Sequence, residues 1–235
     1  MRLLKLCLDR RWSIVLTTHS SEIISQALVE DAFVLIRLDN NGQAVALHCA
    51  DDPAVADELL TWPPARHVLF VEDESAWTLT RVLVDSMDRR VSRTVEVVWG
   101  NGAGYLFELQ SHLPRPPEHK IGFAYLFDGD KRGEVQPSKA KRWPALCLPT
   151  SNDPDELLKR AGADVPDLAR RLNVPSGELT RFLDSQEGLD AHDWVNGLGL
   201  RYGRQVVLKA LAESWVEKNA FEVEPFLKML KDDVF

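Results

Sequence analysis

The sequence has few cysteines and no long apolar run, and these two features exclude several classes of protein. Its three cysteines, Cys7, Cys49 and Cys147, are widely spaced, so they form neither a metal-binding pair nor the framework of a disulfide-rich secreted domain. No stretch approaches the roughly 18 apolar residues that span a membrane, and residues 1–12 are too short and too charged for a signal peptide. We therefore expect a cytoplasmic protein with no membrane partner.

The sequence also lacks an excess of basic residues, since its formal net charge is −8 at pH 7. That balance argues against a general polyanion-binding surface. It does not exclude nucleic acid, because a cluster of acids at a metal site adds negative charge while basic residues can line a local groove. The 235 residues, 45% of them hydrophobic, suffice for one large domain or one domain with appendages.

A short apolar stretch, residues 67–71, predicts a buried strand that ends abruptly in the three acids Glu72, Asp73 and Glu74. Apolar residues at helical spacing follow, and Ser75 is the expected N-cap of that helix. In an open α/β sheet, ligands bind just beyond the carboxyl ends of the strands. The acids therefore stand where a parallel sheet places its chemistry.

A second strand, expected over residues 121–127, ends in Asp128 and Asp130. Two acid clusters at the ends of neighbouring strands predict a site for Mg²⁺ or Mn²⁺, because hard cations prefer carboxylate ligands. Acids at strand ends are also ordinary helix caps, and Asp-Gly is ordinary turn chemistry. Solvated caps are thus the plainer interpretation of either cluster alone.

Strands alternating with helices predict a parallel sheet flanked by helices, a Rossmann-like α/β fold. Two more strands are expected at 95–99, before a glycine-rich turn and a helix, and from Trp143 onward. From about residue 155 the sequence predicts helices that cover the sheet, including 205–216 and 225–230. A helical pair around the turn at 174–177 faintly resembles a DNA-reading helix-turn-helix, although such hairpins are common packing devices.

The first 62 residues predict a smaller unit. We expect an amphipathic helix over residues 1–12, a buried strand at Ile14–Leu16, and a helix capped by serine with Glu22 in its first turn. Two strands around Asn40-Asn41-Gly42 have the signature of a hairpin. A short helix within 51–66 and the Pro63-Pro64 pair then indicate a domain boundary.

The segment from Ile14 to Ser20, an apolar strand followed by Thr-Thr-His-Ser, resembles the switch-histidine region of ABC-type ATPase heads. The resemblance implies that His19 senses the γ-phosphate of ATP, and that the full head pairs as a homodimer. The chain has no GxxxxGK[ST] phosphate loop and no signature motif. We therefore expect only the last piece of such a head, which binds ATP only within a complete head and has no ATPase activity of its own.

The strand that ends in Glu72-Asp73 also resembles the start of a response-regulator receiver. In that family Asp128 would be the phosphoacceptor, with Thr150 or Ser151 as the neighbouring hydroxyl. However, Asp128 is followed by Gly-Asp-Lys-Arg rather than the family's apolar residue and Met-Pro, and no fifth strand ending in lysine is evident.

The order of a strand ending in Glu72, a glycine-rich turn, and a strand ending in Asp128-Gly129-Asp130 resembles the Toprim domain of topoisomerases, primases and nucleases. A Toprim unit preceded by the Thr-Thr-His-Ser segment resembles the OLD (overcoming lysogenisation defect) family of ATPase–nucleases, over roughly residues 12–160. The resemblance implies an endonuclease or nickase that acts on DNA, uses one or two Mg²⁺ or Mn²⁺ ions, and serves in phage defence.

The same resemblance implies roles for particular residues. Glu72 would be a metal ligand or the general acid or base. The further metal ligands would be Asp73, Asp128, Asp130 and, after the fourth strand, Asp155, with Asp153 and Glu156 as rivals. A basic residue from the C-terminal helices, either Arg204 or Lys209, would steady the phosphate. Where the family has a second acid after its glutamate, this sequence has Ala76, which leaves a degenerate Toprim binding module open as an alternative.

The resemblance and the composition together predict three regions. Residues 1–62 are the C-terminal piece of an ATPase head, residues 66–155 the Toprim catalytic domain, and residues 156–235 a helical extension that packs on it.

Overall fold

The computed structural model describes residues 9–30, 32–38, 42–48, 65–135 and 142–235. The chain divides into two compact units, Met1–Pro64 and Ala65–Phe235. None of the helices in the described parts is long and apolar enough to cross a lipid bilayer.

The described residues of the first unit include one complete helix and one hairpin, and residues 9 and 10 are also helical. Helix α2, Ser21–Val29, begins at the N-cap Ser20, whose side chain accepts from the amide of Ile23. Strands β1, Val34–Leu38, and β2, Ala44–His48, pair antiparallel. The capped helix and the hairpin strands are confirmed. The expected helices over 1–12 and 51–66 lie largely outside the described residues.

The strand expected at Ile14–Leu16 is wrong. These residues form no strand, and Ile14, Val15 and Leu16 are 44%, 96% and 56% exposed. A strand needs a neighbour for its backbone groups, and in the described part of this unit the strands β1 and β2 pair with each other. Apolar sequence alone therefore did not place this segment in a sheet.

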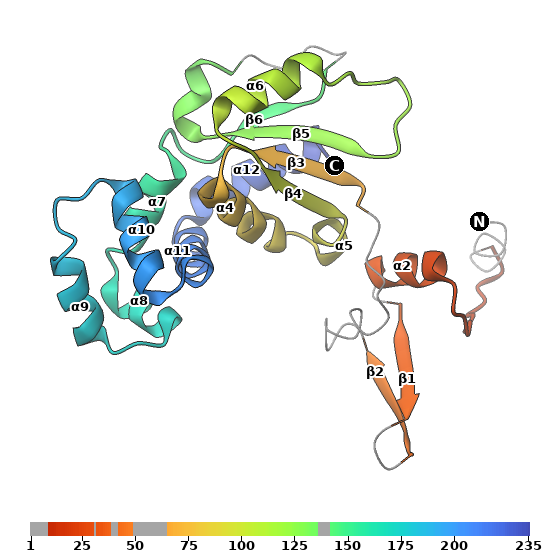
Figure 1. The fold of residues 1–235 in the computed structure, drawn as a ribbon. Coiled ribbons are helices and arrows are strands. Elements are labelled where there is room, and N and C mark those ends of the chain that lie inside the picture. Colours follow the sequence, from red (N-terminus) through yellow and green to blue (C-terminus); the bar gives the residue numbers. More distant parts are fainter. Residues whose placement is uncertain (1–8, 31, 39–41, 49–64, 136–141) are drawn as a thin grey trace. The chain divides into compact units, whose positions relative to one another are not determined.

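The second unit is built on a four-stranded parallel sheet in the order β4-β3-β5-β6 (Figure 1). Its strands are β3, His67–Val71, β4, Val95–Trp99, β5, Gly122–Phe127, and β6, Ala145–Cys147. Because all four are parallel, their carboxyl ends share one edge. Glu72 and Asp128 follow β3 and β5 directly at that edge.

Alternate residues of the strands face two apolar layers. Leu69, Val71 and Leu126 pack on the side of helix α4, Glu74–Asp85. Phe70, Tyr125 and Phe127 belong to the other cluster, which includes Leu106 of helix α6, Ala103–His112. The period of two along each strand thus buries both faces and confirms a parallel sheet flanked by helices. The remaining short helices of this part are α5, Arg89–Ser92, and the 3-10 helix η1, Gly129–Gly133.

The C-terminal region is helical, as predicted. It comprises α7, Pro154–Ala161, α8, Val165–Leu172, α9, Ser176–Asp184, α10, Ala191–Tyr202, α11, Arg204–Lys218, and α12, Ala220–Asp233. Helix α11 lies against α4, α7, α8 and α10, and α12 contacts α4 and α11. The last helix was expected to start at Pro225, but α12 begins five residues earlier, at Ala220. Pro225 therefore lies inside its first two turns.

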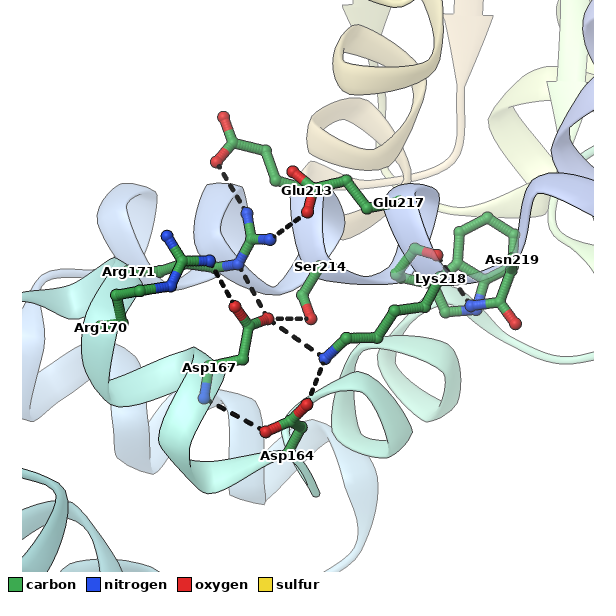
Figure 2. A network of polar contacts seen from close by, with 10 residues as sticks. Asp164, Asp167, Arg170, Arg171, Glu213, Ser214, Glu217, Lys218 and Asn219 are labelled. Atoms are coloured by element: carbon green, nitrogen blue, oxygen red, sulfur yellow. Dashed lines mark hydrogen bonds and ion pairs between the residues drawn. The ribbon is translucent and has the colours of Figure 1, made fainter.

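A network of ion pairs, which we call the α8–α11 network, fixes helix α8 to helix α11 (Figure 2). At its centre, Asp167 accepts from Arg171 Nε at 2.9 Å, Ser214 Oγ at 2.7 Å and Lys218 Nζ at 3.1 Å. The hydrogen bond from Ser214, followed by those from the basic side chains, lowers the pKa of Asp167. The network therefore holds a fully paired carboxylate.

Candidate functional site at the carboxyl edge of the sheet

Glu72 joins the ends of the two central strands. Its side chain is buried, and Oε1 accepts from the amide of Asp128 at 2.9 Å. Burial raises the pKa of Glu72, and the hydrogen bond from that amide opposes the shift. The glutamate is thus fixed at the bottom of the site rather than free in solvent.

Asp128 is the most perturbed acid of the site. It is only 4% exposed, and its Oδ1 is buried without a hydrogen-bond partner among the described residues. Burial raises the pKa of Asp128 to about 9, helped by the charges of four neighbouring acids, Glu72, Asp73, Asp153 and Asp130. A buried polar atom without a partner costs free energy, so this arrangement is unfavourable for folding.

Asp130 lies two residues further along, in η1, at a more open position. Its carboxylate is 41% exposed and forms an ion pair with Lys131 at 2.9 Å. That contact raises the pKa of the Lys131 amine. The Asp-Gly-Asp motif therefore presents one buried and one accessible carboxylate.

Two further acids of the site are helix N-caps. Asp73 accepts from the amide of Ala76 at 2.9 Å and begins α4, so the expected Ser75 cap is wrong. Asp153 accepts from the amide of Asp155 at 2.7 Å and begins α7. Burial, followed by the charges of neighbouring acids, keeps the pKa of both carboxyls above the ordinary value.

Asp155 is buried, and its two oxygens already have protein partners. Ser75 Oγ donates to Oδ1 at 2.5 Å, and His192 Nδ1 lies 2.8 Å from Oδ2. These contacts join α4, α7 and α10 beside the acids. Sequence reasoning missed His192, because a contact between residues 37 positions apart leaves no local signal.

The two basic candidates lie in different surroundings. Arg204, at the start of α11, forms an ion pair with Glu74 and hydrogen-bonds Asn196, and Gln205 also donates to Glu74. Lys209 is 70% exposed, and its amine lies 3.9 Å from Glu213, a member of the α8–α11 network. Of the two, the structure brings Arg204 to the acidic edge.

A tight backbone contact closes the site between β5 and β6. A Cβ atom at Gly129 would lie 2.7 Å from the carbonyl oxygen of Thr150 and 2.8 Å from that of Asn152. Arg132 holds the same loop by donating to the carbonyl oxygens of Leu148 and Thr150 at 2.8 and 2.6 Å. Thr150 has a φ of 68°, which is rare for a β-branched residue.

The donor set fits a hard divalent cation in its chemistry. Carboxylate oxygens are what Mg²⁺ and Mn²⁺ prefer, and the unpartnered Oδ1 of Asp128 offers one among repelling charges. In the described chain, however, no three His, Cys, Asp or Glu side chains stand in positions that could hold a metal ion together. Where the resembling family has another acid, Ala76 is fully buried in the core. Binding thus requires side chains such as Asp130 to turn inward.

The receiver interpretation meets two obstacles. From Leu148 to Phe235, a stretch that is described throughout, the chain forms helices and loops but no fifth strand. The expected phosphoacceptor Asp128 is also buried. The remaining predicted residue, His19, belongs to the first unit, where it is exposed just ahead of α2.

Neither a protein-family model nor a curated protein matches the sequence. Among solved structures, the chain is similar to the C-terminal region of the Burkholderia pseudomallei OLD protein, with a TM-score of 0.42, 14% identity, and coverage of 72% of this chain and 98% of that one. It is also similar to the C-terminal region of the Xanthomonas campestris pv. campestris OLD protein, with a TM-score of 0.36, 13% identity, and coverage of 70% and 97%. The similarity found by comparison is therefore to the C-terminal regions of OLD proteins.

Proposed function

We propose that this chain is a divalent-metal-dependent nuclease that hydrolyses phosphodiester bonds in DNA. The observation that carries the proposal is Asp128, whose buried carboxyl group has an unpartnered oxygen and is surrounded by other acids at the carboxyl edge of a parallel sheet. Such a group destabilises the fold unless a cation joins it. Strongly perturbed acids of this kind are typical of functional sites.

In this proposal the metal is bound by Asp128, Asp130 and Asp73. Glu72 orients Asp128 by accepting a hydrogen bond from the backbone amide of Asp128. When bound, Mg²⁺ or Mn²⁺ supplies Lewis-acid polarisation of the phosphate and a more acidic water. The raised pKa of Glu72 suits a group that accepts and returns a proton. Arg204, held by Glu74 and Asn196, provides positive charge for the phosphate at the rim.

The test is cleavage of supercoiled plasmid by the purified chain with Mg²⁺ or Mn²⁺, compared with EDTA. We expect nicking that EDTA abolishes and that the Asp128→Ala/Asp130→Ala double variant lowers by at least about a thousandfold. Asp184→Asn is the matched control, because Asp184 is an exposed acid on α9.

Nicking that survives the double substitution would contradict the proposal, since the activity would come from another site or a contaminant. Absence of nicking with every divalent metal would favour a Toprim-like binding module instead.

A further inference from the structure

A polar relay runs from the acidic site to helix α10. Asp155 lies between Ser75 and His192, with one carboxylate oxygen bound to each. Asp155 is 6% exposed, whereas the side chain of His192 is 66% exposed. The buried end of this relay is therefore fixed, and its outer end is an imidazole in contact with solvent.

The partners of Asp155 determine how the imidazole is oriented. A carboxylate accepts hydrogen bonds, so Nδ1 of His192 carries the proton that points to Asp155. The hydrogen bond to Asp155, with further help from its charge, raises the pKa of His192. In the protonated form that this shift favours, Nε2 also carries a proton, and on a mostly exposed ring this Nε2–H can donate to an anionic ligand.

The position of the relay links it to the acidic site. Asp155 follows the cap residue Asp153 by two positions, and the charges of Asp155 and His192 both act on Asp73. Arg204 lies on the same side of the site, because its partner Glu74 directly precedes Ser75 on α4. The helical extension thus brings two basic side chains to the rim of the acids.

We propose that His192 contacts the substrate phosphate through Nε2, and that Asp155 is its positioning residue rather than a metal ligand. This inference rests on the proposed nuclease function. It adds to that function a residue that binds the DNA strand. An ion-paired histidine with a purely structural role has no need of an exposed ring. Asp155, with both oxygens hydrogen-bonded inside the protein, has little left to offer a cation.

The test compares His192→Asn with His192→Ala. Asparagine keeps an amide donor near the position of Nδ1, and so retains the contact with Asp155, but it has no counterpart of Nε2. Both variants should cleave plasmid about tenfold more slowly than wild type. His112→Asn is the matched control, because His112 is an exposed histidine on α6 whose Nδ1 also bonds within the chain.

A second measurement is independent of cleavage. Fluorescence anisotropy with a labelled oligonucleotide in Ca²⁺ reports binding alone. The slope of the logarithm of affinity against the logarithm of salt concentration should fall by about 0.9 in His192→Asn, as expected for one lost phosphate contact.

The outcomes separate this inference from the proposed function. If wild type cleaves and His192→Asn matches it in both assays, the role of His192 is structural and the inference is overturned. If wild type neither cleaves nor binds the oligonucleotide, the nuclease proposal fails and the inference fails with it.

Discussion

Two aspartates of this chain, Asp167 and Asp128, lie in opposite electrostatic environments. Asp167 is surrounded by donors in the α8–α11 network, which lower its pKa (Figure 2). Asp128 is buried beside other acids, and its burial, followed by the charges of those acids, raises its pKa to about 9. The first arrangement is complete within the protein, whereas the second lacks a positive partner. The difference teaches that a cluster of acids is not by itself a sign of a functional site. The informative feature is an acid that lacks a positively charged or hydrogen-bonding partner.

The largest effect on stability should come from removing Asp167, the aspartate whose partners are all present. Asp167→Ala removes the acceptor of the buried Ser214 hydroxyl and one of the carboxylates that Arg171 and Lys218 contact, while Glu217 and Glu213 stay beside Arg171. We expect the free energy of unfolding to fall by about 3 kcal/mol, because a buried hydroxyl loses its acceptor and the basic side chains around it lose a shared carboxylate. Urea denaturation followed by circular dichroism measures it. Asp184→Ala, which removes an exposed acid from α9, should change stability little; an equal loss in both variants would contradict this account of the network.

Adding a divalent cation, the positive partner that Asp128 lacks, should have the next largest effect on stability. Mg²⁺ or Mn²⁺ at a hundred times its dissociation constant should raise the free energy of unfolding by about 2.7 kcal/mol, since it binds the folded chain alone. Thermal unfolding with and without the ion measures the gain. Asp128→Asn should lose most of it and Asp167→Asn should keep it. A gain that is equal in all three proteins would place the cation elsewhere.

The smallest effect is the change in stability per pH unit, measured in metal-free buffer, which tests the environment of Asp128 directly. Folded Asp128 keeps its proton up to a pKa of about 9, while an aspartate in the unfolded chain loses it near pH 4. Between these values the folded state binds the extra proton, so stability falls as pH rises. Asp128→Asn cannot ionise and should remove this slope, which is at most about 1.4 kcal/mol per pH unit.

The measurement compares the free energy of unfolding of wild type and Asp128→Asn from pH 5 to 9 in EDTA. A wild-type slope that matches the slope of Asp128→Asn would mean that Asp128 is already ionised in the folded chain.

Much of the sheet could be predicted because its signals are local. The apolar strands 67–71 and 121–127 stop at acids and the strand 95–99 stops at a glycine, and the alternation with helices indicates parallel pairing. The order of the strands is not a local signal, and the structure shows that β3 lies beside β5, which places Glu72 next to Asp128. Ile14–Leu16 has the same apolar signal, yet it forms no strand, because strand formation depends on a neighbour that the segment itself does not encode.

The outer part of the site could not be predicted, because it depends on how helices pack. Asp73 and Ser75 are both good N-cap residues, and only the structure shows that Ser75 bonds Asp155, 80 positions away. Arg204 and Lys209 lie five residues apart on one helix, which turns them about 140° from each other. Sequence alone does not tell which of these faces meets α4.

The close backbone contact at Gly129 has a consequence for how this protein can vary. Even alanine at this position would push its Cβ against two carbonyl oxygens of the loop that follows β6. The middle residue of Asp-Gly-Asp is therefore constrained by space, independently of any reaction at the flanking acids. In a saturation library selected only for soluble expression, position 129 should still be glycine, while the exposed position 130 should accept many residues.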